Sequence, residues 1–378
     1  MFEKATQGMS IYAKIAYTFI LAMAVLNPLA AGSLYYPMPT TVSQFGLYKM
    51  ASFFVILGCA VLFFSLDVAF GERKIRWHSL MWWALGYGVV TLVSYALSID
   101  KRVSLFGEYN RFIGLVPTLL LILFCFISMQ LIRNNASMRL FMRVFVSTSV
   151  LLALYGILQA LGIEFVKFSN MESLGHRSFS YYGNPNLYAG YLCFAVFFSA
   201  GLLVTEKHGG WKAFYWLALI LNLAVTLTSM TRSIWLACVI VGPLFVLFMI
   251  RQKVKTSQVD KVVAGSAVFA GLGFALSTLS RKNPDLNILT RLTSMFNFQG
   301  SSLTRIEIWK SALRVIEKYP LFGAGPDTFG VSSSSLLTKK YVSLVGLEAM
   351  SDNAHCMPLQ LAATVGIVGL LSYYAVLV

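Results

Sequence analysis

Apolar runs of about 20 residues recur along most of the chain, and no other feature constrains the fold as strongly. A helix of that length crosses the hydrocarbon core of a bilayer. Only 12% of the 378 residues are charged, whereas a soluble domain carries roughly a quarter. The sequence therefore predicts an all-α polytopic membrane protein. We expect ten transmembrane helices in this chain, at about residues 11–31, 49–70, 79–97, 112–132, 140–162, 187–205, 211–229, 233–250, 262–279 and 357–377.

The formal charge of +15 is explained by membrane topology and needs no nucleic-acid partner, because Lys and Arg accumulate in cytoplasmic loops. With the N-terminus inside, the inner connections hold Lys and Arg in a two-to-one excess over the short outer ones. This orientation puts the segments with unusual chemistry on the same, extracytoplasmic side. These segments are Ser98–Arg111, Ile163–Asn186, Ser229–Arg232 and the long polar loop Ser280–His355.

The long polar loop contains a predicted amphipathic helix. Thr304 and Glu307 fit a capping box at its start, and Tyr319-Pro320 ends it. We expect this helix to lie on the outer surface or to pack on the bundle. Its apolar side chains fall on one face at helical spacing, at Ile306, Trp309, Leu313 and Ile316.

A glycine-rich stretch, residues 321–330, follows this helix. It lacks the Gly-Lys-Ser/Thr of a phosphate-binding loop, so we interpret it as a tight turn. The cysteines do not form a metal-binding pattern either, since four of the five lie inside predicted spans without CxxC spacing. We expect no structural disulfide, metal or other cofactor. The cysteines are Cys59, Cys125, Cys193, Cys238 and Cys356.

Arg111 is the first candidate for binding an anion. It ends the outer motif that runs from Leu105 and includes Glu108. The alternative is an interfacial loop held by an i, i+3 ion pair between Glu108 and Arg111.

A second group of candidates precedes the sixth predicted span. Arg177 could bind an anion, and Tyr181 and Tyr182 could stack on a sugar. Asn184-Pro185 indicates a turn, and Asn186 fits the N-cap of the next helix. From the residues alone, substrate binding and a purely structural role stay equally open for this group.

Arg232 lies in the tight turn between the seventh and eighth predicted spans. A charge near membrane depth is costly unless it is paired or solvated, which makes Arg232 a candidate functional residue. The flanking hydroxyls of Ser229, Thr231 and Ser233 favour a polar pocket. The alternative is a side chain that extends to the outer headgroups.

Arg305 and His355 complete the candidates. A cation in the first turn of a helix opposes the helix dipole, so Arg305 fits anion binding better than helix stabilisation; a plain membrane-binding helix is the alternative.

His355 is the last strongly polar residue before the tenth predicted span. A neutral imidazole can remove a proton from a hydroxyl, nearby arginines would keep it neutral, and Asp352 could orient it. A lone histidine is otherwise most often a satisfied polar residue.

In their order and spacing, these motifs resemble the O-antigen ligase and polymerase superfamily, which includes bacterial protein O-oligosaccharyltransferases. The resemblance covers about residues 175–375. It implies an N-terminal transmembrane bundle, 1–174, and an O-antigen ligase-like catalytic membrane region, 175–378, with an extracytoplasmic loop at 280–355. The matching pieces are Arg177 with Gly183-Asn184-Pro185-Asn186, Thr231-Arg232-Ser233, Arg305 with Trp309, Gly323-x-Gly325-Pro326-x-x-Phe329, and His355 with Gln360 and Gly366.

The resemblance implies a metal-independent glycosyltransferase at the outer face of the cytoplasmic membrane. Its donor would be a glycan on undecaprenyl diphosphate, and its acceptor a hydroxyl of a glycan, lipid or protein. By position, Arg232 and Arg305 are similar to the family's diphosphate-binding arginines, and His355 to its catalytic histidine. The family often has Asn after this histidine, where this chain has Cys356. That difference bears on a hydrogen bond that would support the histidine.

Two other functions are alternatives to this one. A transporter or flippase for a lipid-linked or anionic solute would have charges within its spans, and here the spans are almost free of acids, with Asp67 near an inner end. A structural scaffold would leave the outer arginines unexplained. The last predicted span ends at Val378 without a polar tail, and the family usually has further spans, so we expect the native chain to continue.

Overall fold

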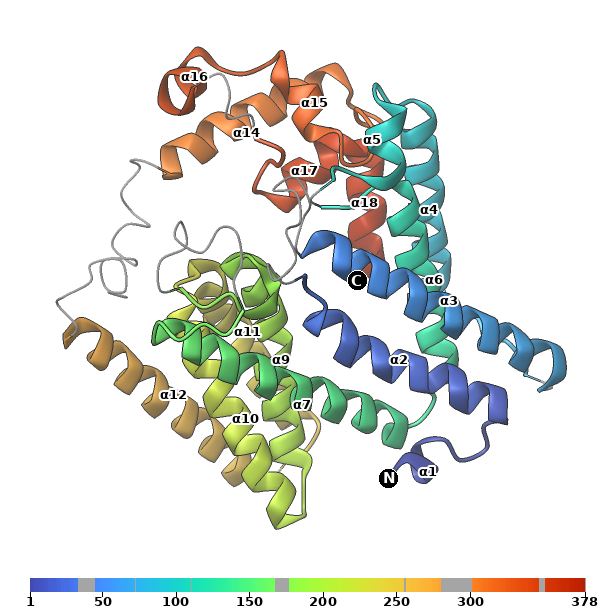
Figure 1. Cartoon of the computed structure of the whole chain (residues 1–378), viewed down its shortest axis with the longest axis vertical. Coiled ribbons are helices and arrows are strands. Elements are labelled where there is room, and N and C mark those ends of the chain that lie inside the picture. The colour runs from blue at the N-terminus through green and yellow to red at the C-terminus, as the bar shows by residue number, and fades with distance from the viewer. Residues whose placement is uncertain are drawn as a thin grey trace. The chain divides into compact units, whose positions relative to one another are not determined.

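The computed structural model of the protein describes residues 1–32, 45–71, 73–109, 111–166, 177–254, 256–279, 301–346 and 351–377. Every regular element within these ranges is a helix (Figure 1). The chain divides into two compact units, each made of two stretches of sequence. Unit 1 comprises Met1–Phe63 and Ile132–Phe296, and unit 2 comprises Phe64–Leu131 and Asn297–Val378.

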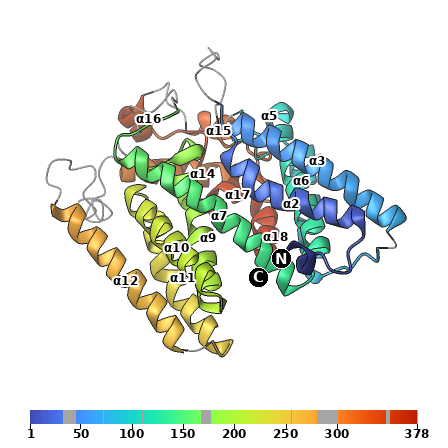
Figure 2. The ribbon, with the colours of Figure 1, turned by 60° about the horizontal axis from the view of Figure 1, so that its bottom comes forward.

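Unit 1 is a bundle in which α7, α9 and α10 pack on one another around two apolar clusters (Figure 2). Its helices begin where the sequence offers caps. Ser10 Oγ accepts a 3.0 Å hydrogen bond from Ala13 N at the start of α2, and Asn134 and Ser137 form a capping box at the start of α7. The elements are α1 (Phe2–Ala5), α2 (Ile11–Leu29), most of α3 (Gly46–Phe70), α7 (Asn135–Ala160), η1 (Ser180–Tyr182), α9 (Pro185–Thr205), α10 (Gly209–Thr228), α11 (Arg232–Arg251) and α12 (Thr256–Leu279).

Unit 2 combines three helices of the first half of the chain with the C-terminal stretch. The α18 helix packs along α4, and α14 packs on α16 and α17 (Figure 1). A buried cluster centred on Ile308, Ala312 and Phe329 joins α14 to the segments that follow it. The elements are the last turns of α3, then α4 (Ser79–Ala96), α5 (Lys101–Phe106), α6 (Leu115–Leu131), α14 (Ser301–Lys318), α15 (Phe329–Ser334), α16 (Lys339–Val345), α17 (Met357–Thr364) and α18 (Gly366–Leu377).

Among the described residues, seven helices are long and apolar enough to cross a membrane, namely α2, α3, α4, α7, α9, α10 and α11. Two shorter apolar helices, α6 and α18, add to these, and α12 covers the ninth predicted span. Much of the apolar surface of these helices remains exposed, for example Val239, Leu244 and Leu247 on α11. Such a surface suits contact with lipid rather than water. The predicted fold class, an all-α polytopic membrane protein, is confirmed.

The tenth predicted span is not one helix. It is broken at Val365 into α17 and α18, and Gly366 adopts a positive φ of 78°. The carbonyls at this break accept hydrogen bonds from the glycine-rich turn, from Ala324 N to Ala363 O and from Gly325 N to Thr364 O, both 2.9 Å. The sequence predicts one continuous helix here because the segment is mostly apolar. The break is instead set by hydrogen bonds to a distant turn.

The amphipathic helix of the polar loop differs in two respects from the prediction. It begins at Ser301, so Thr304 is inside α14, and the predicted capping box is wrong. The face that packs inward carries Ile308, Ala312 and Val315, whereas Leu313, on the predicted apolar face, is 56% exposed. Ala312 and the buried Ser311 are small and let the neighbouring segments approach closely, so packing on the protein overrides the apolar periodicity.

Glu307, the predicted capping partner, has a different role. Its buried carboxylate accepts hydrogen bonds of 2.7 Å from Lys310 Nζ and from Thr338 Oγ1. Thr338 is the N-cap of α16 and accepts from Tyr341 N. The bonds from Lys310 and Thr338 hold the pKa of Glu307 below its usual value. The side chain therefore ties α14 to the start of α16.

Candidate functional site

The loop that carries Arg111 surrounds the buried carboxylate of Asp327, which comes from the C-terminal stretch of unit 2. Asp327 Oδ2 accepts hydrogen bonds from Glu108 N (2.9 Å) and Ile113 N (3.4 Å). Gly107 has a φ of 94°, and a Cβ there would lie 2.7 Å from Asp327 Oδ2. Only glycine fits a backbone that passes so close to the carboxylate.

Arg111 is placed between two carboxylates rather than beside Glu108. Its Nε lies 3.6 Å from Asp327 Oδ1, and its Nη1 lies 3.9 Å from Asp352 Oδ2. Nη1 also donates a 2.9 Å hydrogen bond to the backbone carbonyl of Asp352. Among the described residues, the ion pairs of Arg111 are therefore with Asp327 and Asp352. The i, i+3 ion pair with Glu108 that the sequence allowed is not formed.

The backbone around His355 is held from three sides. Trp309 Nε1 donates to Ala354 O (3.0 Å) from α14, and Ala354 N donates to Gln360 Oε1 (2.9 Å) in α17. His355 N donates to Asn353 Oδ1 (2.9 Å), and His355 itself has a positive φ of 50°. Positive φ is unfavourable for a residue with a side chain, so these contacts hold a conformation that the chain would not adopt by itself.

The surroundings of His355 favour its neutral form. Partial desolvation of the ring lowers its pKa below the usual value, and the charges of Arg305 and Arg111 act in the same direction. The carboxylate of Asp352 acts in the opposite direction, with an influence smaller than that of Arg305. The sequence anticipated the effect of the arginines but not that of desolvation. Asp352 lies near enough to influence the ring, while its backbone carbonyl is held by Arg111.

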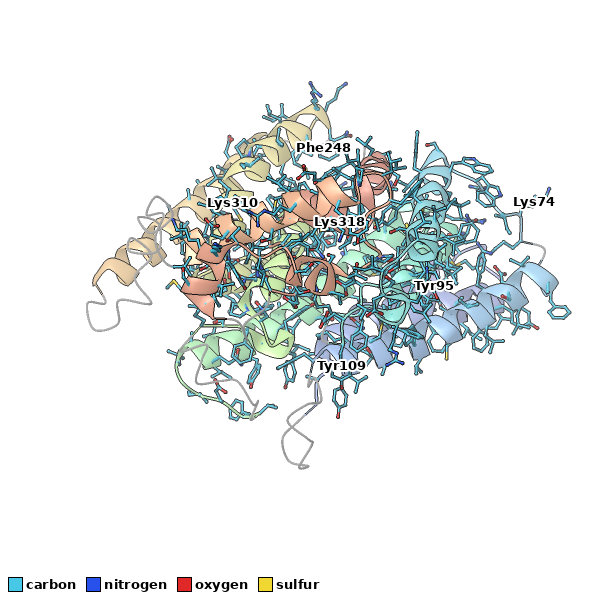
Figure 3. The ribbon with its side chains drawn as sticks, turned by 90° about the horizontal axis from the view of Figure 1, so that it is seen from above. Lys74, Tyr95, Tyr109, Phe248, Lys310 and Lys318 are labelled. Carbon is cyan, nitrogen blue, oxygen red and sulfur yellow. The ribbon has the colours of Figure 1, made fainter. Side chains whose placement is uncertain are left out.

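Arg305 lies on the exposed side of α14, on the helix that also carries Trp309. It is one turn inside the helix rather than in the first turn, because α14 starts at Ser301. Lys310 and Lys318 lie further along the same helix (Figure 3). Arg305 is close enough to His355 to lower the pKa of the imidazole. Unit 2 thus brings together His355, Arg305, Arg111 and Asp352.

A largely apolar cavity of about 360 Å³ adjoins this cluster within unit 2. Arg111 and Asp327 line it, and so does Gln360, whose side chain holds the backbone of Ala354. Met357, two residues after His355, is also part of its wall. The remaining lining is largely apolar and comes from α4, α6, α17 and α18.

In unit 1, Arg177 fixes the turn that leads into Arg232. Its Nε donates to Ser229 O (3.0 Å), and its Nη2 lies 3.3 Å from Thr231 Oγ1. The turn is tight, and Met230 has a positive φ of 51°. Thr231 is the N-cap of α11, but its side chain does not accept from the amides of the first turn. The half-buried Arg232 is the first residue of α11.

The other unit 1 candidates take part in the structure of the same region. Asn184 is the N-cap of α9, and its Oδ1 accepts from Asn186 N (2.8 Å). The prediction of Asn186 as the N-cap is therefore wrong, because Pro185 already occupies the first helical position. The centroids of the Tyr182 and Tyr188 rings lie 5.5 Å apart. Lys49 Nζ lies 4.5 Å from the centroid of the Tyr182 ring.

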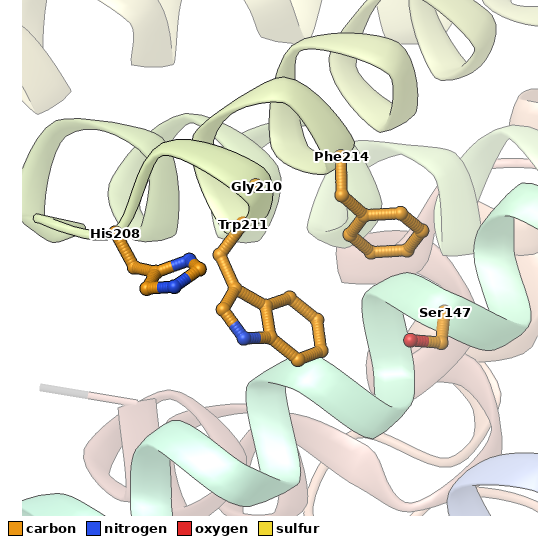
Figure 4. A pocket seen from close by; sticks show the side chains of 5 residues that line it. All are labelled: Ser147, His208, Gly210, Trp211 and Phe214. Atoms are coloured by element: carbon orange, nitrogen blue, oxygen red, sulfur yellow. The ribbon is translucent and has the colours of Figure 1, made fainter.

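A second pocket, of about 380 Å³, lies in unit 1 at the start of α10 (Figure 4). It is lined by Ser147 of α7 and by His208, Gly210, Trp211 and Phe214. None of the candidate site residues lines it. None of the described residues that line it is an arginine or a carboxylate.

Sequence reasoning missed Asp327, Gln360 and Asn353 as members of the unit 2 cluster. Gln360 was noted only as part of a motif. Asp327 follows Gly325-Pro326, where a polar residue at a turn is unremarkable. Its contacts with Glu108 and Arg111 are more than 200 positions away along the chain, and nothing local indicates them.

The helices and this cluster define a multi-pass membrane protein that carries a neutral histidine beside an arginine on a polar surface. Residues 217–374 match the family model described as O-Antigen ligase. This match supports the resemblance to the O-antigen ligase superfamily that the motifs indicated. The match includes Arg232, Arg305 and His355, whereas Arg111, Arg177, Tyr182, Asn184 and Asn186 precede it. No curated protein matches the chain.

Proposed function

We propose that the protein is a membrane glycan ligase or polymerase, a glycosyltransferase-type enzyme that acts on lipid-linked glycans, as the match to the O-antigen ligase family model supports. We propose that its donor is a glycan on undecaprenyl diphosphate and that it transfers or polymerises this glycan onto an acceptor hydroxyl. We place the reaction at the extracytoplasmic face of the cytoplasmic membrane. The observation that carries the proposal is the pairing in unit 2 of a neutral base, His355, with a nearby guanidinium, Arg305.

The proposed reaction is a direct displacement at the anomeric carbon of the donor. His355 removes the proton of the acceptor hydroxyl, and the hydroxyl oxygen forms a bond to the anomeric carbon as the bond from that carbon to the diphosphate oxygen breaks. The leaving diphosphate takes the electron pair. Arg305 neutralises its charge, because a guanidinium suits phosphate oxygens and stays protonated. A positioned general base typically contributes about 10²–10⁴-fold to a rate.

Arg232, in unit 1, is proposed to bind an anionic group of a substrate. Its support is the motif Thr231-Arg232-Ser233, which falls inside the family match, and its place at the start of α11. Amides in the first turn of a helix bind anions, and the side chain of Thr231 leaves those of α11 uncapped. The contacts of Arg177 with Ser229 and Thr231 favour a role in holding this turn over direct binding of substrate.

The apolar cavity of unit 2 is proposed to receive part of the lipid chain of a substrate. It adjoins Met357 and Gln360, next to the loop that bears His355. Lipid-linked substrates need such a surface near the reacting groups. The alternative, a transporter, is less well supported. Asp67, the acid noted near an inner end, is paired with Arg73 and is therefore accounted for as a structural ion pair.

The test uses purified protein in detergent with an undecaprenyl diphosphate-linked oligosaccharide and a mixture of glycan, lipid and peptide acceptors. Release of undecaprenyl diphosphate together with a glycosylated acceptor is measured. We expect His355→Ala to lower the rate by about 10²–10⁴-fold, while His208→Ala, in the unit 1 pocket, leaves it unchanged. Full activity of the folded His355→Ala variant would exclude His355 as the base. Transport needs two compartments, so product formed in detergent also excludes a transporter.

A further inference from the structure

Asp327 is a buried carboxylate of unit 2 that contacts Arg111 and has no role in the proposed reaction. Its side chain is 1% exposed. One oxygen, Oδ2, accepts the backbone amides of Glu108 and Ile113. The other, Oδ1, accepts no hydrogen bond from the described residues and lies 3.6 Å from Arg111 Nε. Burying a carboxylate is costly unless a partner of opposite charge compensates it. The charge of Arg111 therefore offsets the cost of burying Asp327.

Arg111 also contacts the loop that carries His355. While its Nε faces Asp327, its Nη1 donates 2.9 Å to the carbonyl of Asp352. The next residue, Asn353, accepts the amide of His355 through its Oδ1 at 2.9 Å. A rigid guanidinium can bridge two acceptors in this way because its donors have a fixed geometry. The chain of contacts from Asp327 to His355 is continuous.

The backbone along this chain of contacts is strained. Six described non-glycine residues have a positive φ, and three of them are Phe112, Asp327 and His355. Such conformations are unfavourable for residues with a side chain and persist only where the surroundings impose them. Phe112 lies in the loop that wraps Asp327, and His355 ends the chain of contacts. The strained residues therefore lie at Asp327, next to Arg111 and at His355.

We propose that Asp327 is a positioning residue for His355, acting through Arg111 and the carbonyl of Asp352, and that Arg111 serves this purpose rather than binding substrate. This inference rests on the proposed role of His355 in catalysis. The position of the histidine matters because a displacement of about 1 Å in a catalytic group can lower a rate about 10²-fold. Asp327 does not touch the reacting atoms.

The matched control is Asp100, another carboxylate of unit 2 that accepts two backbone amides. Its Oδ1 accepts from Arg102 N (2.9 Å) and Val103 N (3.0 Å) at the start of α5. It forms no ion pair with Arg111. Asp327→Asn and Asp100→Asn therefore remove the same charge and weaken the same kind of amide bonds, but only the first removes the partner of Arg111.

The test measures hydrogen–deuterium exchange of the full chain in detergent, in the peptide that spans residues 351–360. The amides of Ala354 and His355 report on the loop directly, since both are bonded within it or to α17. We expect Asp327→Asn to raise the exchange rate of this peptide about tenfold or more and Asp100→Asn to leave it unchanged. An unchanged rate in folded Asp327→Asn protein would overturn the inference.

A second variant covers the case in which Asp327→Asn does not fold. Arg111→Lys keeps the charge but cannot bridge Asp327 Oδ1 and the Asp352 carbonyl, because an ammonium lacks the guanidinium fork. We expect the same rise in exchange, and a wild-type exchange rate would overturn the inference. In the transfer assay, positioning predicts a fall of about 10²-fold in kcat with the donor KM unchanged, whereas a raised KM with full kcat would show that Arg111 binds substrate.

The exchange measurement also separates the inference from the proposed function. If wild-type protein shows no transferase activity but Asp327→Asn still loosens residues 351–360, the proposed function fails and the structural coupling stands. If His355→Ala abolishes transfer but neither variant changes exchange or kcat, the proposed function stands and the positioning role of Asp327 is wrong.

Discussion

His355 gains a proton less readily than an ordinary histidine, because desolvation of its ring and the charges of Arg305 and Arg111 lower its pKa. A base with a lowered pKa stays neutral to a lower pH. We therefore expect kcat/KM to be constant from neutral pH down to below about 6.5, the usual pKa of histidine. It should then fall as the pH drops through the lowered pKa and His355 becomes protonated.

Arg305→Gln tests the origin of this effect. Removing the cation removes a repulsion on the imidazolium, so the pKa of His355 should rise and the acid limb of the pH–rate profile should move to higher pH. The donor KM should rise in the same variant, since a ligand of the diphosphate is lost. Lys318→Gln, on the same helix but at its far end, serves as the control. An acid limb at the same pH in Arg305→Gln would show that the charge of Arg305 does not lower the pKa of His355.

At the scale of elements, the join between the glycine-rich turn and the α17–α18 break leaves no room for a side chain at Gly366. Gly366 has a φ of 78°, and a Cβ there would collide with the backbone of Leu321. A side chain at positive φ costs about 1–2 kcal/mol, and overpacking adds about 1–3 kcal/mol. We expect Gly366→Ala to lower the melting temperature of the detergent-solubilised protein by several degrees.

Gly86→Ala is the matched control for this substitution. Gly86 lies within α4 of the same unit, and nothing lies within 4 Å of a Cβ built on it. Alanine is favoured over glycine by about 1 kcal/mol inside a helix, so this variant should melt at the same temperature or higher. Equal melting of Gly366→Ala and Gly86→Ala would mean that the break between α17 and α18 is not fixed by the turn.

The helices that are apolar throughout could be predicted from the sequence, because length and hydropathy alone define a membrane span. The same reasoning failed where long-range contacts decide. The break at Val365 depends on bonds from Ala324 and Gly325, and the inward face of α14 depends on small residues such as Ala312 that carry little hydropathy signal. Candidate residues were found by type and motif, but the bridge from Asp327 through Arg111 joins positions that only the fold brings together.

For the whole molecule, the excess of Lys and Arg in alternate connections predicts that the N-terminus is inside and the polar loop of unit 2 is outside. Two exposed lysines of unit 2 test this orientation. Lys74 lies in the connection between α3 and α4, which is predicted to be inside, and Lys339 begins α16 in the polar loop, which is predicted to be outside. In a background with every native cysteine replaced by alanine, Lys74→Cys and Lys339→Cys each carry a single thiol.

Intact cells are treated with a membrane-impermeant maleimide before and after permeabilisation. We expect Lys339→Cys to react in intact cells and Lys74→Cys only after permeabilisation, because the first thiol faces the outer solution and the second the cytoplasm. The reverse pattern would invert the topology. It would place His355 and Arg305 on the cytoplasmic side and exclude transfer at the extracytoplasmic face, although the chemistry proposed for the two residues would be unaffected. Labelling of both thiols in intact cells would mean that these two connections do not lie on opposite sides of the membrane.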